Sequence, residues 1–585
     1  MSGDGIRIRV PALTRVEGEG ALELDIAGGR LEAVRLRIYE PPRLFEKFLE
    51  GREFHEVPDL VARICGICPV AYQMSAVRAL EAVLAVEVPP WVAAMRRAMY
   101  CGEWIQSHAL HIHLLAAPDF LGCDSVVELA QREPEAVRRG LALQALGNRI
   151  IELFGGRSVH PVGVRVGGFH RAPDPAAVAA LVQDLDRALA QAESLVHWCA
   201  RLPRPRMEQA MTLVAVDGAG AYPMAGDRLR SSDGLDIAIA EFADHFTETQ
   251  VPHSTALHCL LRGRPYLVGP LARFWLGYEH LPEEVRQAAA AAGLDRPSRD
   301  MYDSMVVRAV EILYAVWEAR RLLADYAVPG ASAVEAAPAA GTGFGCTEAP
   351  RGVLWHRYEL RADGTVAAAR IVPPTSQNQA RMEEDLRLVL ERRGLEREAG
   401  AIRRDAEQVI RNYDPCISCA THFLHLRVDR DGAVQEAGPP AAGEGGVTVL
   451  GIGSPAPGDD LGWRVVEALA ATPGVRERAR LARLDRPGAG LVHHLDGGGP
   501  VILVDAMEGA APGEVVVVDG ARLAGQGGGR GLSSHGYGVD GALALARALG
   551  VSLERVTVVG EASADGAAVA RVADAVCRRL GLPRA

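Results

Sequence analysis

The chain has 585 residues, of which 49% are hydrophobic, so it can bury more than one core and we expect at least two folded units. The formal net charge of −11 gives no positive field for a phosphate backbone, and no Lys/Arg-rich run supplies a local one, so nucleic acid is not an expected partner. No apolar stretch reaches the roughly 18 residues of a membrane span, and the N-terminus lacks a signal-peptide pattern. We therefore expect a cytoplasmic protein with no membrane span.

The first elements in chain order are two strands followed by long helices. Apolar and polar residues alternate over 22–26 and 34–38 around Gly28-Gly29, which is typical of a half-buried hairpin. Four segments then show helical periodicity: 91–115, 137–154, 174–199 and 303–326. Asp174-Pro175 predicts a capped helix start with proline in the first turn. Residues 1–427 are therefore expected to form a mainly α-helical domain with small peripheral β-sheets.

A second domain is expected after a linker. Residues 428–446 are rich in glycine, proline and alanine, which predicts a flexible connection. Four apolar runs follow, at 447–451, 501–506, 515–519 and 556–560. Helical patterns separate them, at about 461–472, 539–549 and 565–580. This alternation predicts an α/β doubly wound parallel sheet over 447–585, with functional loops at the carboxyl ends of its strands.

Two Cys-x-x-Cys pairs, Cys65/Cys68 and Cys416/Cys419, carry the strongest chemical signal. Ten cysteines are too few for a disulfide scaffold in a chain of this length, whereas four thiolates suit nickel, iron or zinc. A zinc ribbon would place its pairs within about 15–20 residues of each other, and a thioredoxin-like redox pair would need a βαβ context that the N-terminal region does not show. Because the pairs lie at opposite ends of the first domain, the fold must bring them together in its core.

Four further sequence blocks accompany the cysteine pairs. They are Thr14–Gly18, Arg43–Glu46, Glu348–His356 and Val372–Thr375. With these blocks, residues from about 6 to 427 resemble the large, catalytic subunit of the nickel–iron hydrogenases, most closely the cytoplasmic NAD(P)-linked or multimeric soluble branch. The quinone-site subunit of respiratory complex I is a distant relative that has lost these thiolates, so their presence here favours hydrogen chemistry. The resemblance implies reversible conversion of H2 to protons and electrons.

The resemblance also implies a role for each matching residue. Cys65 and Cys416 match the terminal nickel ligands, and Cys68 and Cys419 match the bridges between nickel and iron. Arg351, Pro374 and Thr375 match the surroundings of the cyanide and carbonyl ligands on iron, where Arg351 and Thr375 can donate to cyanide nitrogen. Glu17 matches the glutamate that relays protons from the terminal thiolate.

Two further matches concern a magnesium site and a substitution. Glu46, the main-chain carbonyl of Ile371 and His422 match a Mg2+ site that fastens the end of the mature subunit. Tyr72 stands where many relatives have histidine, and it offers a hydroxyl but no imidazole that titrates near neutrality.

The second domain has its own resemblance. Val449–Gly453 suggests a dinucleotide site, but the third glycine is missing and Asp459-Asp460 would repel phosphates. Residues 447–582 instead resemble the hydrogenase maturation endopeptidases, which trim the C-terminal tail of the large subunit. The matching residues Asp460, Asp505 and His535 would form a metal site that senses nickel. The expected cut is at His422–Phe423, within the same polypeptide.

These resemblances imply several partners. The chain lacks further cysteine clusters for an electron wire, so an iron–sulfur small subunit is expected, together with flavin/NAD(P) electron-transfer subunits and nickel-insertion and maturation factors. One alternative stays open: a processing factor whose first domain is a docking scaffold and whose endopeptidase acts in trans. Retention of the four cysteines, the arginine block and His422 favours the enzyme, because a scaffold needs none of them.

Overall fold

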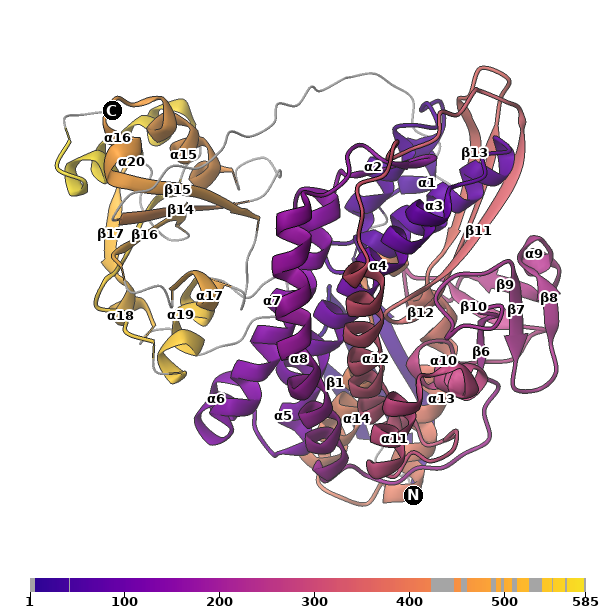
Figure 1. Ribbon diagram of the computed structural model, residues 1–585. Coiled ribbons are helices and arrows are strands. Elements are labelled where there is room, and N and C mark those ends of the chain that lie inside the picture. The colour runs from indigo at the N-terminus through magenta and orange to yellow at the C-terminus, as the bar shows by residue number, and fades with distance from the viewer. Residues whose placement is uncertain are drawn as a thin grey trace. The chain divides into compact units, whose positions relative to one another are not determined.

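A computed structural model describes residues 6–40, 43–421, 447–453, 460–485, 491–495, 499–507, 513–524, 539–549, 551–562 and 565–582 (Figure 1). The chain divides into two compact units: the larger contains residues 1–124 and 139–425, and the smaller 125–138 and 426–585. Every helix in the described ranges is too short or too polar to cross a membrane. The predicted linker, 428–446, lies outside the described residues.

Long helices form the centre of the larger unit. They are α3 (Pro69–Val83), α4 (Pro90–Leu110), α7 (Pro134–Gly155), α8 (Pro175–Arg201), α12 (Ser304–Ala324), α13 (Pro374–Arg393) and α14 (Ala399–Tyr413). The four helices predicted from periodicity are confirmed. α8 begins as predicted, because the Asp174 side chain accepts a hydrogen bond from the Ala177 amide at 3.1 Å. α12 is buried on almost every side and packs against both α4 and α8.

Shorter helices connect these. They are α1 (Phe45–Leu49), α2 (Val57–Val61), α5 (Ala117–Phe120), α9 (Phe242–His245), α10 (Pro270–Gly277) and α11 (Glu283–Ala291). A further short helix, α6 (Val126–Arg132), belongs to the smaller unit. A π-helical segment, His111–Ala116, continues α4. Such segments are uncommon and often lie near functional sites.

The strands of the larger unit form antiparallel sheets. They are β1 (Ile6–Val10), β2 (Gly20–Ala27) and β3 (Arg30–Ile38); β4 (Val164–Arg165) and β5 (Gly168–Phe169); β6 (Val214–Val216), β7 (Arg228–Ser231) and β8 (Asp236–Ala238); β9 (Phe246–Thr249) and β10 (His258–Leu261); and β11 (Gly341–Ala349), β12 (Gly352–Leu360) and β13 (Val366–Val372). The predicted hairpin is β2–β3, in which Leu24 pairs with Val34. That prediction is confirmed.

The sheet β11–β12–β13 corrects the expectation of peripheral sheets. Most of β12 is buried, and α3 packs so closely on β11 that a Cβ atom at Gly345 would lie 2.1 Å from the carbonyl oxygen of Ser75. β11 was not predicted, because its nine residues include three glycines, which are depleted in strands. This buried sheet carries the turn with Arg351, and β13 leads directly into α13.

The smaller unit contains a five-stranded sheet in the order β15-β14-β16-β18-β17 (Figure 1). Its elements are β14 (Val447–Gly453), α15 (Leu461–Ala471), α16 (Val475–Arg478), β15 (Ala479–Asp485), α17 (Leu491–Leu495), β16 (Val501–Ala506), β17 (Val516–Asp519), α18 (Gly520–Leu523), α19 (Val539–Ala548), β18 (Val556–Glu561) and α20 (Gly566–Arg579). Val449 and Ile502 join one core with α15 and α20, while their neighbours Leu450 and Leu503 are also buried, so both faces of the sheet are covered.

Two strands of this sheet differ from the expectation. β15 was not predicted, because its charged, edge-strand sequence Ala-Arg-Leu-Ala-Arg-Leu-Asp lacks an apolar run. β17 lies antiparallel to β18 at the other edge, whereas the remaining strands are parallel. β15 lies on one side of β14 in the sheet, and β16, the next strand in the chain, lies on the other side of β14. The strand order therefore reverses between β14 and β16. In α/β sheets, ligands bind at the carboxyl ends of the strands at such a switch point.

Candidate metal centre

The larger unit brings the two cysteine pairs together in its core. The Sγ atoms of Cys65 and Cys416 are 3.4 Å apart, as are those of Cys68 and Cys419, and Cys416 and Cys419 are 2.6 Å apart. All four sulfur atoms lie within 4.8 Å of one another, and the four residues are buried. Four sulfur donors at these separations fit one or two metal ions that share thiolates.

The first pair lies in a turn before α3. The amides of Ile67 and Cys68 donate to the Cys65 Sγ atom at 3.3 and 3.4 Å, and α3 begins at Pro69 directly after Cys68. The buried carboxylate of Glu103 accepts from the Val70 amide at 2.6 Å and so caps the helix. Amide donors of this kind favour the thiolate form of cysteine.

The second pair follows the end of α14. Asp414 has a left-handed conformation, with φ of 58°, which ends α14. Arg308 donates to the carbonyl oxygens of Asn412 and Tyr413, at 3.3 and 3.2 Å, which satisfies the end of the helix. The Cys416 amide donates to the hydroxyl of Thr375 at 3.0 Å. Pro374 begins α13, so this helix start holds the second pair in place.

Arg351 fixes the same segment from the β11–β12 turn. Its Nε atom donates to the Asp414 carbonyl oxygen at 2.7 Å, and Nη2 donates to the Asp414 carboxylate at 2.9 Å. Its third nitrogen, Nη1, is buried and has no hydrogen-bond partner in the described part of the chain. An unused guanidinium donor beside the thiol cluster fits a site whose bound group carries hydrogen-bond acceptors.

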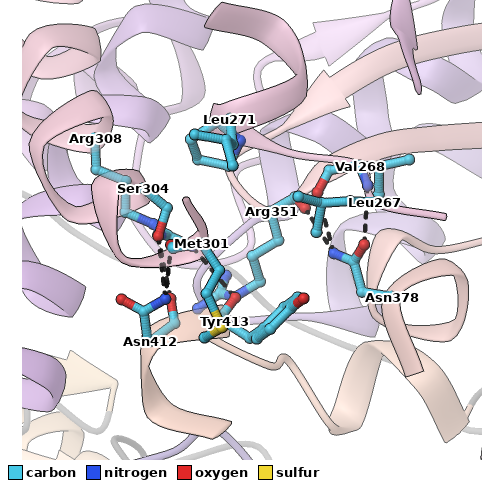
Figure 2. Close-up of a pocket in the computed structure, with 11 residues that line it drawn as sticks. Leu267, Val268, Leu271, Met301, Ser304, Arg308, Arg351, Asn378, Asn412 and Tyr413 are labelled. Carbon is cyan, nitrogen blue, oxygen red and sulfur yellow. Dashed lines mark hydrogen bonds between the residues drawn. The ribbon is translucent and has the colours of Figure 1, made fainter. Parts of the chain in front are cut away.

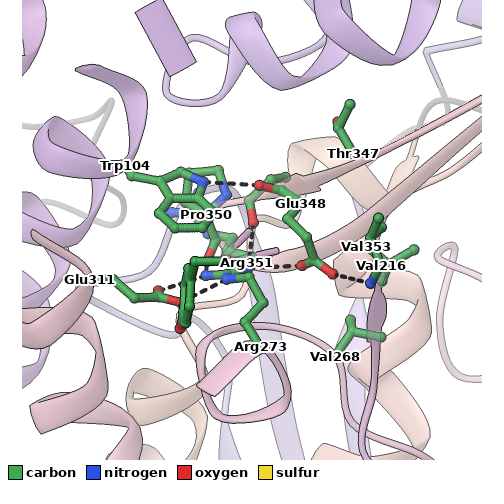
Figure 3. Close-up of polar contacts among 12 residues, drawn as sticks. Trp104, Val216, Val268, Arg273, Glu311, Thr347, Glu348, Pro350, Arg351 and Val353 are labelled. Carbon is green, nitrogen blue, oxygen red and sulfur yellow. Dashed lines mark hydrogen bonds and ion pairs between the residues drawn. The ribbon is translucent and has the colours of Figure 1, made fainter. Parts of the chain in front are cut away.

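A buried ion-pair network supports the Arg351 turn (Figure 3). Arg273 donates to the carbonyl oxygens of Ala349 and Pro350 at 2.9 and 3.0 Å. The same guanidinium forms two 2.8 Å hydrogen bonds with Glu311 and one of 3.0 Å with Glu348. Because each charge has a partner in the core, the network holds the turn without a bare buried charge. Nothing in the sequence around Arg273 marks this role, because its partners lie on distant segments.

A small cavity lies beside Arg351 (Figure 2). It has a volume of about 20 Å³, which corresponds to roughly one water-sized molecule. Its wall includes Leu271, Met301, Ser304, Arg308, Arg351 and Tyr413. The arginine that holds the second cysteine pair therefore also borders space for one small molecule.

Without a bound cation, burial opposes the loss of protons from these thiols. Burial raises the pKa of Cys416 well above its usual value, and the neighbouring Cys419 thiol raises it further. Burial also opposes ionisation of Cys65, but hydrogen bonds from the other three thiols lower the pKa of Cys65 well below its usual value. The cluster thus favours one thiolate, and a metal would supply the positive charge that four thiolates need.

A line of polar groups leads away from Cys416. Glu17 is buried and forms an isolated β-bridge with Cys416, and its carboxylate accepts from the Ser418 amide at 3.0 Å. The Ser418 hydroxyl is 3.3 Å from the carboxylate of Glu40, which is half-buried. Burial raises the pKa of Glu40, and the charge of Glu17 adds to this effect. Nothing in the sequence marked Glu40, because its contacts join segments far apart in the chain.

Glu46 and Ile371 also meet. The Glu46 carboxylate accepts from the Ile371 amide at 2.7 Å, and burial raises the pKa of Glu46 from 4.5 to about 8. The predicted third member, His422, lies outside the described residues. Tyr72 is buried on α3, where burial and the nearby Cys419 and Cys68 thiols raise the pKa of its hydroxyl well above the usual value. Tyr72 therefore stays protonated and can act only as a neutral hydrogen-bonding group.

The histidines of α4 and of the π-helical segment lie in the core. His108, His111 and His113 are buried, and His108 pairs with Glu311 at 2.9 Å. The six cysteines outside the two pairs are buried, as expected for small core residues.

Two acidic residues predicted as ligands lie near the switch point of the smaller unit. Asp460 precedes α15, and its carboxylate is 4.0 Å from Arg464. Asp505 lies near the carboxyl end of β16, where its side chain accepts from the Ala506 amide at 2.8 Å. Since β14 and β16 are adjacent and parallel, both acids follow the same edge of the sheet. The third residue, His535, lies outside the described residues.

Comparison with known proteins identifies the family that has this arrangement. The sequence profile of the nickel-dependent hydrogenases matches residues 43–140 and 259–422. Sulfhydrogenase 2 subunit alpha of Pyrococcus furiosus is 35% identical over 430 residues, which cover 72% of this chain and 100% of that protein. NAD-reducing hydrogenase HoxS subunit beta of Cupriavidus necator is 28% identical over 465 residues, which cover 72% of this chain and 95% of the relative.

A solved structure agrees with these sequence relatives. An NAD+-reducing [NiFe]-hydrogenase in its H2-reduced state superposes with a TM-score of 0.66 at 27% identity, covering 71% of this chain and 99% of the matched chain. The two cysteine pairs, joined in the core of a fold that such relatives share over almost their full length, show that the chain belongs to the nickel-dependent hydrogenase family.

Proposed function

We propose that this chain is the catalytic subunit of a hydrogenase that converts H2 reversibly to two protons and two electrons. The observation that carries the proposal is the cluster of four buried cysteine sulfur atoms within 4.8 Å of one another. A nickel–iron centre with cyanide and carbonyl ligands on iron would supply the binding and heterolytic splitting of H2. Cys65, Cys68, Cys416 and Cys419 would hold it.

The chain's own side chains would handle protons and position the centre. Glu17 is suited to accept a proton that leaves the Cys416 sulfur, because its backbone pairs with that of Cys416 and its buried carboxylate accepts from the amide of Ser418, two residues further on. Ser418 contacts both Glu17 and Glu40, which offers a way onward from the core. The free Nη1 donor of Arg351 is suited to a cyanide nitrogen, and Thr375 and Pro374 fix the second cysteine pair.

The test is to produce the chain with its maturation factors and partner subunits, then to measure nickel, iron and H2-dependent dye reduction. We expect about one nickel and one iron per chain together with activity. A fully matured complex that contains neither metal nor activity would overturn the proposal.

Electrons released in the core need a route to an acceptor. The six cysteines outside the two pairs are buried and scattered through the sequence, so they do not form the cysteine sets that hold iron–sulfur clusters. We infer that an iron–sulfur small subunit receives the electrons and that flavin/NAD(P) subunits accept them afterwards. Relatives named NAD-reducing hydrogenase support this inference. The expected cytoplasmic location is consistent with NAD(P) as the final acceptor.

If Glu46 binds Mg2+, the stabilisation of the fold by Mg2+ should depend on pH. Since burial raises the pKa of Glu46 from 4.5 to about 8, the metal-free fold prefers the protonated acid, and this contribution to stability is lost as pH rises toward 8. Mg2+ binds the carboxylate and so replaces the proton. We expect Mg2+ to raise the melting temperature more at pH 8.5 than at pH 6.5, measured by differential scanning fluorimetry against EDTA. Glu46→Gln should remove this difference, and an equal Mg2+ effect at both pH values would contradict the site.

We further propose that the smaller unit is a maturation endopeptidase that cuts the chain after His422. Its support is the position of Asp460 and Asp505 at the carboxyl edge of adjacent parallel strands, together with the sequence resemblance that includes His535. A short linker raises the local concentration of such an enzyme at its target to about the millimolar range, which favours cutting in cis.

Intact-mass analysis of the protein from nickel-replete cells tests the cut. We expect a fragment that ends at His422, and we expect Asp460→Asn, Asp505→Asn or His535→Gln to leave the chain full-length. Asp519→Asn is a matched control. Asp519 ends the antiparallel strand β17 and pairs with Thr557 near the start of β18, so it lies at the end of the sheet opposite to the carboxyl ends of the parallel strands. Cleavage of a tagged Asp460→Asn chain by a co-expressed wild-type chain would show action in trans. A full-length wild-type chain in active cells would contradict processing altogether.

A further inference from the structure

A second set of metal-binding side chains lies in the larger unit, apart from the cysteine cluster. His253, His258 and Glu383 each offer a ligand atom, and these atoms lie within 4.8 Å of one another. His253 belongs to the loop between β9 and β10, His258 begins β10, and Glu383 lies in the middle of α13. The set therefore joins a hairpin to a helix that lies far from it in sequence.

The existing hydrogen bonds satisfy only part of this set. The Glu383 carboxylate accepts from the Leu36 amide at 2.8 Å and pairs with His253 Nε2 at 2.8 Å. His258 is only 5% exposed, and its Nε2 atom is buried without a hydrogen-bond partner among the described residues. The His258 ring packs edge-on against His253, with centroids 5.8 Å apart. A buried imidazole nitrogen without a partner is costly, and a bound cation would remove that cost.

The ligand chemistry and access suit a borderline transition metal. Two imidazoles and one carboxylate are typical ligands of zinc and related divalent ions. Bonds of about 2.0–2.2 Å to such an ion place donor atoms ~3.3 Å apart, so small rotations of the side chains would close the site. The side chains of His253 and Glu383 are 20% and 17% exposed, which leaves a path from solvent and room for a fourth, non-protein ligand.

We propose that His253, His258 and Glu383 bind one divalent ion of the zinc class, separate from the nickel–iron centre. The ion ties the β9–β10 hairpin to α13. Because Pro374 and Thr375 begin α13 and Thr375 accepts from the Cys416 amide, the ion stabilises the helix that positions the second cysteine pair. The site is a structural staple whose ligands take no part in the reaction.

Zinc titration of the matured complex tests this site, because there the four cysteines are already occupied. We expect wild-type protein to hold one zinc more per chain than Glu383→Gln or His253→Gln after gel filtration, with nickel and iron unchanged in all three. Zinc affinity should fall at least about 100-fold in either variant, since even outer-shell partners of metal ligands contribute 10–100-fold. Glu383→Gln retains an acceptor for the Leu36 amide, so it should still fold.

His55→Gln is the matched control, because His55 is exposed and lies 3.2 Å from Glu53, and the described residues place no third metal ligand beside this pair. It should bind zinc like the wild type. Co2+ provides a second readout: absorption bands of a nitrogen- and oxygen-ligated ion, without sulfur charge transfer, should appear in the wild type and disappear in His253→Gln. Equal zinc content and affinity in the wild type and both ligand variants would overturn the proposal, as would cobalt spectra with sulfur charge transfer.

Discussion

Replacing Glu17 with glutamine is expected to lower the rate of H2 oxidation by about 10²–10⁴-fold without changing the nickel and iron content. The Glu17 carboxylate is buried and accepts from the Ser418 amide at 3.0 Å. Glutamine keeps the size and the hydrogen-bond acceptor, so the Cys416 segment should stay in place. It cannot take up a proton at that position, so proton transfer should become slow. H2-dependent dye reduction and metal analysis of the same sample measure both parts of the prediction.

Isotope exchange separates proton transfer from assembly. Formation of HD from D2 in ordinary water requires a proton from solvent to reach the centre, so it should fall together with turnover in Glu17→Gln. Glu19→Gln is the matched control, because Glu19 lies two residues further on and is exposed. Glu40→Gln should change exchange in the same direction if Ser418 and Glu40 continue the route. Wild-type exchange in Glu17→Gln would exclude Glu17 as the relay.

The helices and the site could be predicted from the sequence through different signals. Periodicity found α4, α7, α8 and α12, because each has a face or circumference of apolar residues that must be buried. The cysteine pairs were recognisable because two thiols on one turn are a local pattern. Their meeting in the core could be inferred only from the metal chemistry, since no local signal links residues so far apart.

The strands and supporting residues were harder to predict. β11 contains three glycines that allow α3 to pack closely, a purpose that is visible only when both elements are in place. Arg273 and Glu40 act through contacts with distant segments, and their neighbours in sequence give no hint of those contacts. In the smaller unit, β15 was missed because its two arginines, Arg480 and Arg483, interrupt the apolar run, although charged residues suit an edge strand.

Arg351→Lys is expected to lower H2 oxidation by about 10²–10³-fold while leaving the metal content close to that of the wild type. Arginine uses its planar fork to hold the Asp414 carbonyl and carboxylate at 2.7 and 2.9 Å, and it still has the buried Nη1 donor available. Lysine retains the positive charge beside the thiols but has a single nitrogen on a flexible stem. It can serve Asp414 or a group on the metal centre, but not both in this geometry.

The control is Arg357→Lys, in the strand β12 that follows the Arg351 turn, because Arg357 is partly exposed and pairs with Glu359 at 3.2 Å. That substitution should leave activity within about twofold of the wild type, since exposed ion pairs contribute little. Infrared spectra of the diatomic ligands distinguish the two duties of Arg351. A shift of the cyanide bands with intact metals indicates a lost hydrogen bond at the centre, whereas loss of nickel indicates that the Asp414 segment has moved. Full activity with unshifted bands in Arg351→Lys would mean that positive charge alone suffices at this position.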